Sequence, residues 1–126
     1  MRLLLDSHLL LWAASEPERI SAETRDLIAA SERYFSAASL WELAIKSALG
    51  RSDFVVDVAA LYVGLRDNQY GELPVASAHA LFTTSLPPIH KDPFDRILVA
   101  QAILEGLTLL TADATVARYG GAVRLV

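Results

Sequence analysis

The chain has 126 residues, 53% of them hydrophobic, and a formal net charge of -4 at pH 7. A chain of this size can bury a substantial core, so we expect one domain over residues 1–126. Because the sequence contains no cysteine, disulfide bonds, thiolate catalysis and cysteine-ligated zinc are excluded. The negative charge argues against a nucleic-acid partner, unless several of the carboxylates bind metal.

The first fifteen residues, MRLLLDSHLLLWAAS, superficially look like a secretion signal. However, Asp6 and His8 lie inside the part of such a signal that must be apolar, which favours a cytoplasmic protein instead. The longest apolar runs are also well short of the roughly 20 residues that span a bilayer.

Strands and helices are expected to alternate along the chain. Residues 2–5 predict a short buried strand that ends at Asp6, and Ser21 is the expected N-cap of a later helix. Ser39 is expected to open a further helix, which places Glu42 in its first turn, with Gly50 as the residue that ends it. The expected strands are residues 2–5, 33–37, 71–75, 107–111 and 122–126, and the expected helices are residues 7–14, 21–31, 39–50, 58–68, 77–84, 93–105 and 114–119.

The second half of the chain contains the clearest boundary signals. Phe54 and Val55 lead into the helix after Asp57, and Pro74 restricts its own strand to the edge of a sheet. Asp92 and Pro93 begin the longest helix, which ends at Gly106. Alternating strands and helices predict the α/β class, with a mostly parallel sheet covered by helices on both faces.

Four acidic residues occupy comparable places in this scheme. They are Asp6, Glu42, Asp95 and Asp113. In an open parallel sheet, ligands bind at the edge where the strands have their carboxyl ends, and all four acids are expected to point there. Without these four acids, the rest of the chain would carry no net formal charge.

Helix capping is the simpler explanation for each acid taken alone. Ser39 and Glu42 match a capping box, Asp92 and Asp95 stand at N-cap and N3, and Asp6 and Asp113 could each cap the following helix. For any single acid we favour capping by roughly two to one, because acids are enriched in first turns. Capping does not explain why all four converge on one edge.

Carboxylates gathered at one place repel each other unless a cation neutralises them. An oxygen-only site prefers Mg²⁺ or Mn²⁺, and water activated by such a metal can attack a phosphodiester. Other residues give weaker signals. Ser7 and Thr111 lie beside site acids and could bond a carboxylate, although local capping explains them at least as well.

Basic and aromatic residues allow more than one interpretation. His8, His79 and His90 lack metal-ligand spacing, so ordinary surface or packing roles are expected for them. Five basic or imidazole side chains could either bind RNA phosphates near the acids or be ordinary solvated surface groups: Lys46, Arg51, His90, Lys91 and Arg96. Core packing is favoured over base stacking for four aromatic residues: Trp12, Trp41, Phe82 and Phe94.

The motifs LLLDSHLLLW, SAASLWELAIKSALG and LPPIHKDPFDRILVAQAILEGLTLLTAD resemble those of PIN-domain ribonucleases of the VapC toxin type. The resemblance runs essentially end to end and implies a three-layer α/β/α fold with a mostly parallel central sheet. It also implies a Mg²⁺- or Mn²⁺-dependent endoribonuclease that acts as the toxin of a type II toxin–antitoxin pair. Family members are usually homodimers and are inhibited by a cognate antitoxin protein.

By motif, the resemblance assigns Asp6, Glu42 and Asp95 to the metal core, and Asp113 to completing the site or positioning a second metal. Arg96, Ser7 and Thr111 are weaker candidates for contacts with RNA. The alternative is a non-catalytic PIN-like module that binds RNA or an antitoxin. A phosphoaspartyl phosphatase is disfavoured, because that class has a second Asp where this chain has His8.

Overall fold

The computed structural model describes residues 1–50 and 55–126, and its elements alternate as the sequence predicts. The strands are β1 (Arg2–Leu5), β2 (Glu32–Ser36), β3 (Gly71–Leu73), β4 (Thr108–Thr111) and β5 (Val123–Leu125). The α-helices are α1 (Ser7–Ser15), α2 (Ala22–Ala29), α3 (Ala37–Ala48), α4 (Val58–Asp67), α5 (Ser77–Phe82), α6 (Pro93–Glu105) and α7 (Ala114–Ala117). Short 3-10 helices lie at Pro17–Arg19 and Thr83–Ser85.

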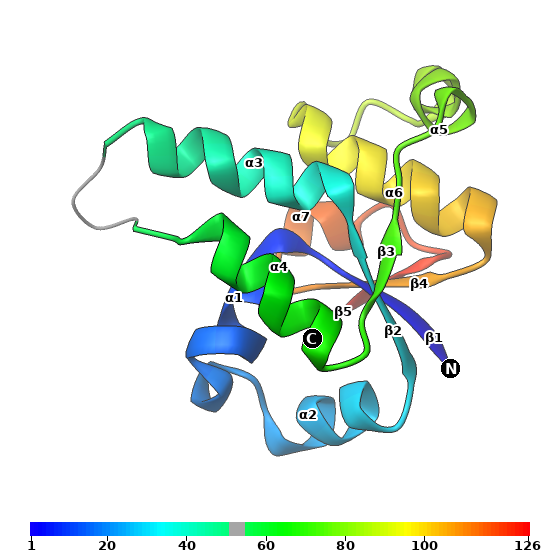
Figure 1. Ribbon diagram of the computed structural model, residues 1–126. Coiled ribbons are helices and arrows are strands. Elements are labelled where there is room, and N and C mark those ends of the chain that lie inside the picture. Colours follow the sequence, from blue (N-terminus) through cyan, green and yellow to red (C-terminus); the bar gives the residue numbers. More distant parts are fainter. Residues whose placement is uncertain (51–54) are drawn as a thin grey trace.

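The strands form one parallel sheet in the order β3-β2-β1-β4-β5 over the described residues. β1 is central, and β3 lies at an edge, as Pro74 led us to expect. Helices cover both faces, so the arrangement has three layers (Figure 1). The predicted α/β class and mostly parallel sheet are therefore confirmed.

Two apolar cores lie on opposite faces of the sheet. Along β1, Leu3 and Leu5 enter the core beneath α1, α2 and α4, whereas Leu4 enters the core beneath α6 and α7. In β4, Leu110 and Leu109 divide in the same way. Side chains alternate along a strand, and these strands read as continuous apolar runs because both of their faces are covered.

Parallel pairing brings the carboxyl ends of β1, β2 and β4 to the same edge. Asp6 directly follows β1, and its backbone N–H donates to the Leu110 carbonyl in β4 at 3.1 Å. The long helix α6 begins where predicted, with Asp92 as N-cap and Pro93 in its first turn. It ends at Gly106, whose φ of +67° is a left-handed conformation that glycine adopts without strain.

One boundary differs from the sequence prediction in a way that affects the site. Helix α3 begins at Ala37, directly after β2, and its N-cap is Ser36, whose side chain accepts the Ala38 N–H at 3.1 Å. The expected capping box between Ser39 and Glu42 is therefore wrong. Glu42 lies in the second turn of α3, where its carboxylate does not cap the helix.

Two predictions concern residues outside the described ones: Phe54, expected to lead into the helix after Asp57, and Arg51, a candidate to flank the acids. In the parts of the chain that the structure describes, no helix combines the length and apolar composition needed to cross a bilayer.

Candidate active site

Asp6 lies buried at the carboxyl end of β1, with only 5% of the residue exposed. One carboxylate oxygen accepts the Leu9 N–H at 2.9 Å, which caps α1, and the other accepts the Thr111 hydroxyl at 2.6 Å. Burial raises the pKa of Asp6, and the hydrogen bond from Thr111 opposes this rise most strongly. Asp6 is therefore both a helix cap and a candidate metal ligand.

Glu42 is equally buried but belongs to α3. Ser7 Oγ donates to its Oε1 at 2.6 Å, and Lys46 Nζ contacts its Oε2 at 2.8 Å. Both oxygens of this carboxylate are thus held by side chains from α1 and α3. Since Glu42 caps no helix, capping does not account for a carboxylate at this 4%-exposed position.

Asp95 and Asp113 meet around a histidine. His90 Nε2 lies 3.3 Å from Asp95 Oδ2 and 3.8 Å from Asp113 Oδ2. Ligand atoms of these three residues lie within 4.8 Å of one another. The other oxygen of Asp113 caps α7 by accepting the Thr115 N–H at 2.7 Å, as the sequence had suggested. One oxygen of each of these two acids therefore faces His90.

The four acids form an acid cluster with two halves, Asp6 with Glu42 and Asp95 with Asp113. Thr111 connects these two halves. Its fully buried hydroxyl donates to Asp6 and accepts the Asp113 backbone N–H at 3.0 Å. Ser7 makes the corresponding link between α1 and Glu42. Both hydroxyls thus bond carboxylates or their backbone, which is one of the two roles considered for them, and both are buried.

The neighbouring acids also change the pKa of Asp95. The pKa of Asp95 is raised to about 7, first because the carboxyl group is partly buried and then because Asp92, Glu42 and Asp6 repel its negative charge. His90 opposes this rise. A carboxylate held among other carboxylates is stabilised by a bound cation, and an oxygen-rich donor set suits a hard divalent ion. The residues present therefore fit such a metal.

The structure places two of the basic or imidazole candidates. His90, for which a surface or packing role was favoured and a place flanking the acids was the alternative, lies next to Asp95 and Asp113. Arg96, a weak candidate for RNA binding, already donates to three backbone carbonyls, those of Thr83, Pro87 and His90. It also donates to the Tyr119 hydroxyl. Its guanidinium thus holds the loop before α6, and RNA binding by Arg96 would require these bonds to break.

The position of His90 could not be found from residue spacing, because it depends on a loop held by distant residues. The only sequence signal was its nearness to Asp92 and Asp95 in the motif before α6. Lys46, also considered as a flanking residue, does contact the site through Glu42.

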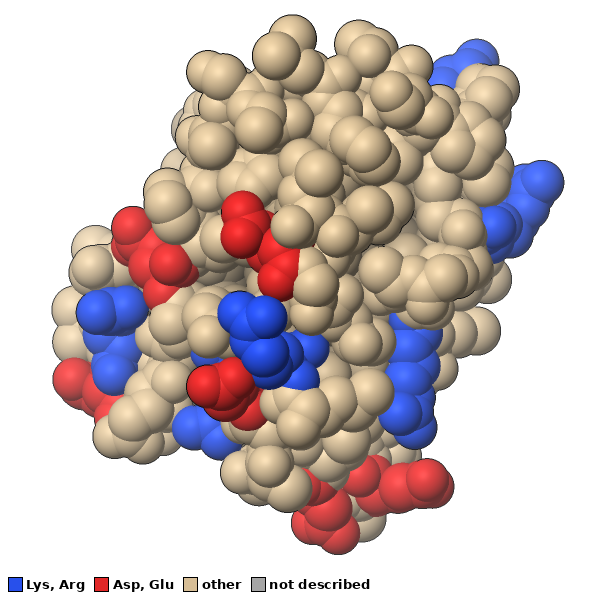
Figure 2. All heavy atoms as spheres, turned by 90° about the vertical axis from the view of Figure 1, so that its right-hand side faces the viewer, with Lys and Arg blue, Asp and Glu red and all other residues tan. Residues whose placement is uncertain are grey.

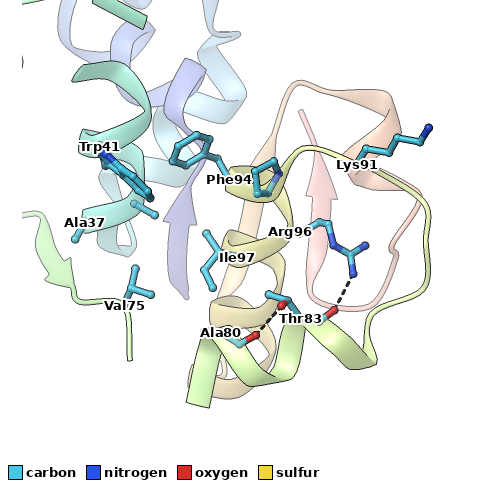
Figure 3. A pocket seen from close by; sticks show the side chains of 11 residues that line it. Ala37, Trp41, Val75, Ala80, Thr83, Lys91, Phe94, Arg96 and Ile97 are labelled. Carbon is cyan, nitrogen blue, oxygen red and sulfur yellow. Dashed lines mark hydrogen bonds between the residues drawn. The ribbon is translucent and has the colours of Figure 1, made fainter. Parts of the chain in front are cut away.

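An apolar cavity of about 680 Å³ opens between α3, α5 and the first turns of α6 (Figure 3). Trp41 and Phe94 meet at its rim, edge to face, with ring centroids 5.3 Å apart. Each of these residues directly precedes a site acid in the sequence. Trp41 is 65% exposed, so the expectation that it belongs to the core was wrong: an α3 that begins at Ala37 turns Trp41 outward while Glu42 and Leu43 face inward.

Comparison with known proteins gives a consistent result. A family model described as PIN domain matches residues 3–122. The chain is similar to Ribonuclease VapC22 of Mycobacterium tuberculosis (strain ATCC 25618 / H37Rv), with 34% identity over 113 residues, 87% of this chain and 85% of that protein.

Solved structures of similar fold include VapBC2 from Rickettsia felis bound to a DNA fragment from their promoter, with a TM-score of 0.72 and 14% identity. That match covers 100% of this chain and 98% of the other. VapBC-1 from nontypeable Haemophilus influenzae gives a TM-score of 0.69 at 15% identity, covering 100% and 97% of the two chains. At these identities the likeness shows the fold alone.

Proposed function

The chain belongs to the PIN-domain family, and from this premise we propose that it is a metal-dependent endoribonuclease acting as the toxin of a type II toxin–antitoxin pair. Similarity to a curated ribonuclease supports the activity. The observation that carries the proposal is the convergence of buried or partly buried carboxylates around Asp95, whose pKa is raised to about 7 by burial and by neighbouring acids. Such a cluster fits a cation, and helix capping by Asp6 and Asp113 explains only part of it.

We assign Asp6, Glu42, Asp95 and Asp113 as the catalytic and metal-binding residues. Asp95 and Asp113 would offer carboxylate oxygens directly, while Thr111 and Ser7 hold Asp6 and Glu42 in position. A bound Mg²⁺ or Mn²⁺ would supply activation of water and stabilisation of the negative charge that develops on the phosphate. The chain's own contribution is to hold the carboxylates before substrate arrives, so that little reorganisation is needed.

The first test is cleavage of a mixed cellular RNA pool by the purified chain with Mg²⁺ or Mn²⁺, and with a chelator. Cleavage should require metal and be lost in Asp95→Asn. Asp26→Asn, which alters an exposed acid on α2, is the matched control and should cleave normally. If folded wild-type protein that is free of antitoxin binds RNA but does not cleave it, the result would instead favour a non-catalytic binding module.

We also propose a homodimer formed through the face around α5 and the cavity. Figure 2 shows this side of the molecule, and its upper part carries few charged side chains. Trp41, Val75 and Leu81 are 65%, 44% and 71% exposed there. Exposed apolar side chains gathered on one face are typical of a protein interface. Leu81→Glu should shift the molar mass measured by light scattering from dimer to monomer, and a monomeric wild-type chain would contradict the proposal.

The antitoxin partner is proposed from the same family relation. The solved neighbours include toxin–antitoxin complexes, such as one from Klebsiella pneumoniae. A reading frame directly beside this one should encode a protein that copurifies with the chain and suppresses its cleavage of RNA. We place both proteins in the cytoplasm, where the RNA substrate would be met.

A further inference from the structure

His90 is held in one orientation by its own ring and by its backbone. Its Nδ1 accepts the Asp92 N–H at 3.0 Å. Since a nitrogen that accepts a hydrogen bond presents its lone pair, the ring hydrogen is on Nε2, the nitrogen that faces Asp95 and Asp113. His90 therefore presents an N–H donor to the acid cluster. To ligate a metal through Nε2 it would have to move that hydrogen to Nδ1, opposite the Asp92 N–H.

The backbone of His90 is clamped from two other elements. The Tyr119 hydroxyl, which lies just after α7, accepts the His90 N–H at 3.1 Å. Arg96 from α6 reaches the His90 carbonyl at 3.4 Å and the Tyr119 hydroxyl at 3.1 Å. These bonds from two elements fix the loop against its conformational entropy and so fix the position of the ring.

The direction of this N–H limits what it can bind during the proposed reaction. If Asp95 and Asp113 held a cation, the His90 N–H would face the same space and could donate to an acceptor bound beside that cation. The RNA substrate brings such an acceptor, its phosphate. Lys46, a second side-chain nitrogen beside the acids, is already paired with Glu42 at 2.8 Å.

We propose that His90 is a substrate-binding residue whose Nε2–H donates a hydrogen bond to a phosphate oxygen of the RNA at the acid cluster. This inference rests on the proposed nuclease function, from which the phosphodiester substrate comes. It separates the site into carboxylates that hold the cation and an imidazole that holds the phosphate. His90 is thus expected to contribute to substrate affinity and not to metal affinity.

The direct test observes the imidazole of the full-length ¹⁵N-labelled chain by long-range ¹H–¹⁵N NMR, with inorganic phosphate as the probe. His90→Gln identifies the His90 signals. With Mg²⁺ alone the ring should keep its hydrogen on Nε2, and phosphate added with Mg²⁺ should shift the Nε2 signal. Conversion to the Nδ1–H form by Mg²⁺ alone would make His90 a metal ligand and overturn the proposal, as would an Nε2 signal that phosphate leaves unmoved.

A second test compares His90→Gln with wild type on an RNA that the wild-type chain is shown to cleave. Loss of a hydrogen bond to a charged group should lower kcat/KM by about 10- to 100-fold, while the Kd for Mn²⁺, measured by calorimetry, changes less than about twofold. Asp26→Asn, which alters an exposed acid on α2, is the control and is expected to change neither quantity. A weakened Mn²⁺ affinity in His90→Gln would show that the ring only positions the carboxylates.

The two proposals can fail separately. A phosphate-induced Nε2 shift in a chain that cleaves no RNA would overturn the nuclease function and retain the phosphate donor. Metal-dependent cleavage together with an unmoved Nε2 signal would retain the nuclease and overturn the role of His90.

Discussion

The two halves of the acid cluster are built differently. Asp6 and Glu42 are almost fully buried, and each of their four carboxylate oxygens already has a partner. Asp95 and Asp113 have side chains 19% and 45% exposed, and each turns an oxygen toward His90. The first half is part of the core between β1 and α3, whereas the second is reached from solvent. A ligand must therefore enter through the second half, while the first half fixes where it binds.

The largest expected effect is on RNA cleavage, which should be lost in both halves, whereas stability should fall in only one of them. Asp95→Asn and Asp6→Asn should each lower RNA cleavage by on the order of 100-fold or more, beyond the roughly 10- to 100-fold that loss of a supporting group costs. Only Asp6→Asn should also lower the free energy of unfolding, by about 1–3 kcal/mol, because its amide nitrogen must face a donor. Urea unfolding checks this, and equal stability of the two variants would contradict the comparison.

Thr111→Val tests whether the buried half supports the exposed one. The substitution keeps the shape but removes the hydroxyl that bonds Asp6 and the Asp113 N–H. We expect a loss of about 10- to 100-fold in Mn²⁺ affinity by calorimetry, as for other groups that orient metal ligands. Thr108→Val, which changes a less buried threonine at the start of the same strand, serves as control. Unchanged affinity in Thr111→Val would mean that Asp6 and Asp113 act independently.

The raised pKa of Asp95 predicts how stability depends on pH. In the folded chain without metal its pKa is about 7, above the ordinary value of 3.8, so the folded state holds a proton that the unfolded state releases. The free energy of unfolding should therefore fall as pH rises from about 4 to about 7. In Asp95→Asn this contribution should disappear, so in chelator the variant gains stability over wild type toward pH 8. A difference that stays constant with pH would contradict the prediction.

The smallest effect is expected at Lys46. Its ammonium pairs with Glu42 at 2.8 Å within one helix, but its side chain is 40% exposed. Glu42 is buried, but Lys46→Gln keeps a hydrogen-bond donor near its Oε2, so the free energy of unfolding should fall by only about 1 kcal/mol. Thermal unfolding at low and high salt measures this, and a loss of several kcal/mol would place Lys46 in the rigid half of the site.

Much of the fold followed from local sequence signals. Apolar runs located β1 and β4, and Asp92, Pro93 and Gly106 set the limits of α6. Each signal acts within a few residues of where it stands, through capping, a fixed φ or a run of buried side chains. The start of α3 was misplaced because Ser36 and Ser39 are both acceptable N-caps, and the pairing of β2 with β1 decides between them.

The candidate site was predicted as a set of acids, but its geometry was not. The sequence by itself determined that carboxylates follow parallel strands, because the ends of such strands share one edge. Only the tertiary structure decided that Trp41 faces outward, that Arg96 is taken up by backbone carbonyls and that His90 joins the acids. The physical reason is that contacts between residues far apart in the chain, such as Tyr119 with His90, depend on how the helices pack, which no local pattern specifies.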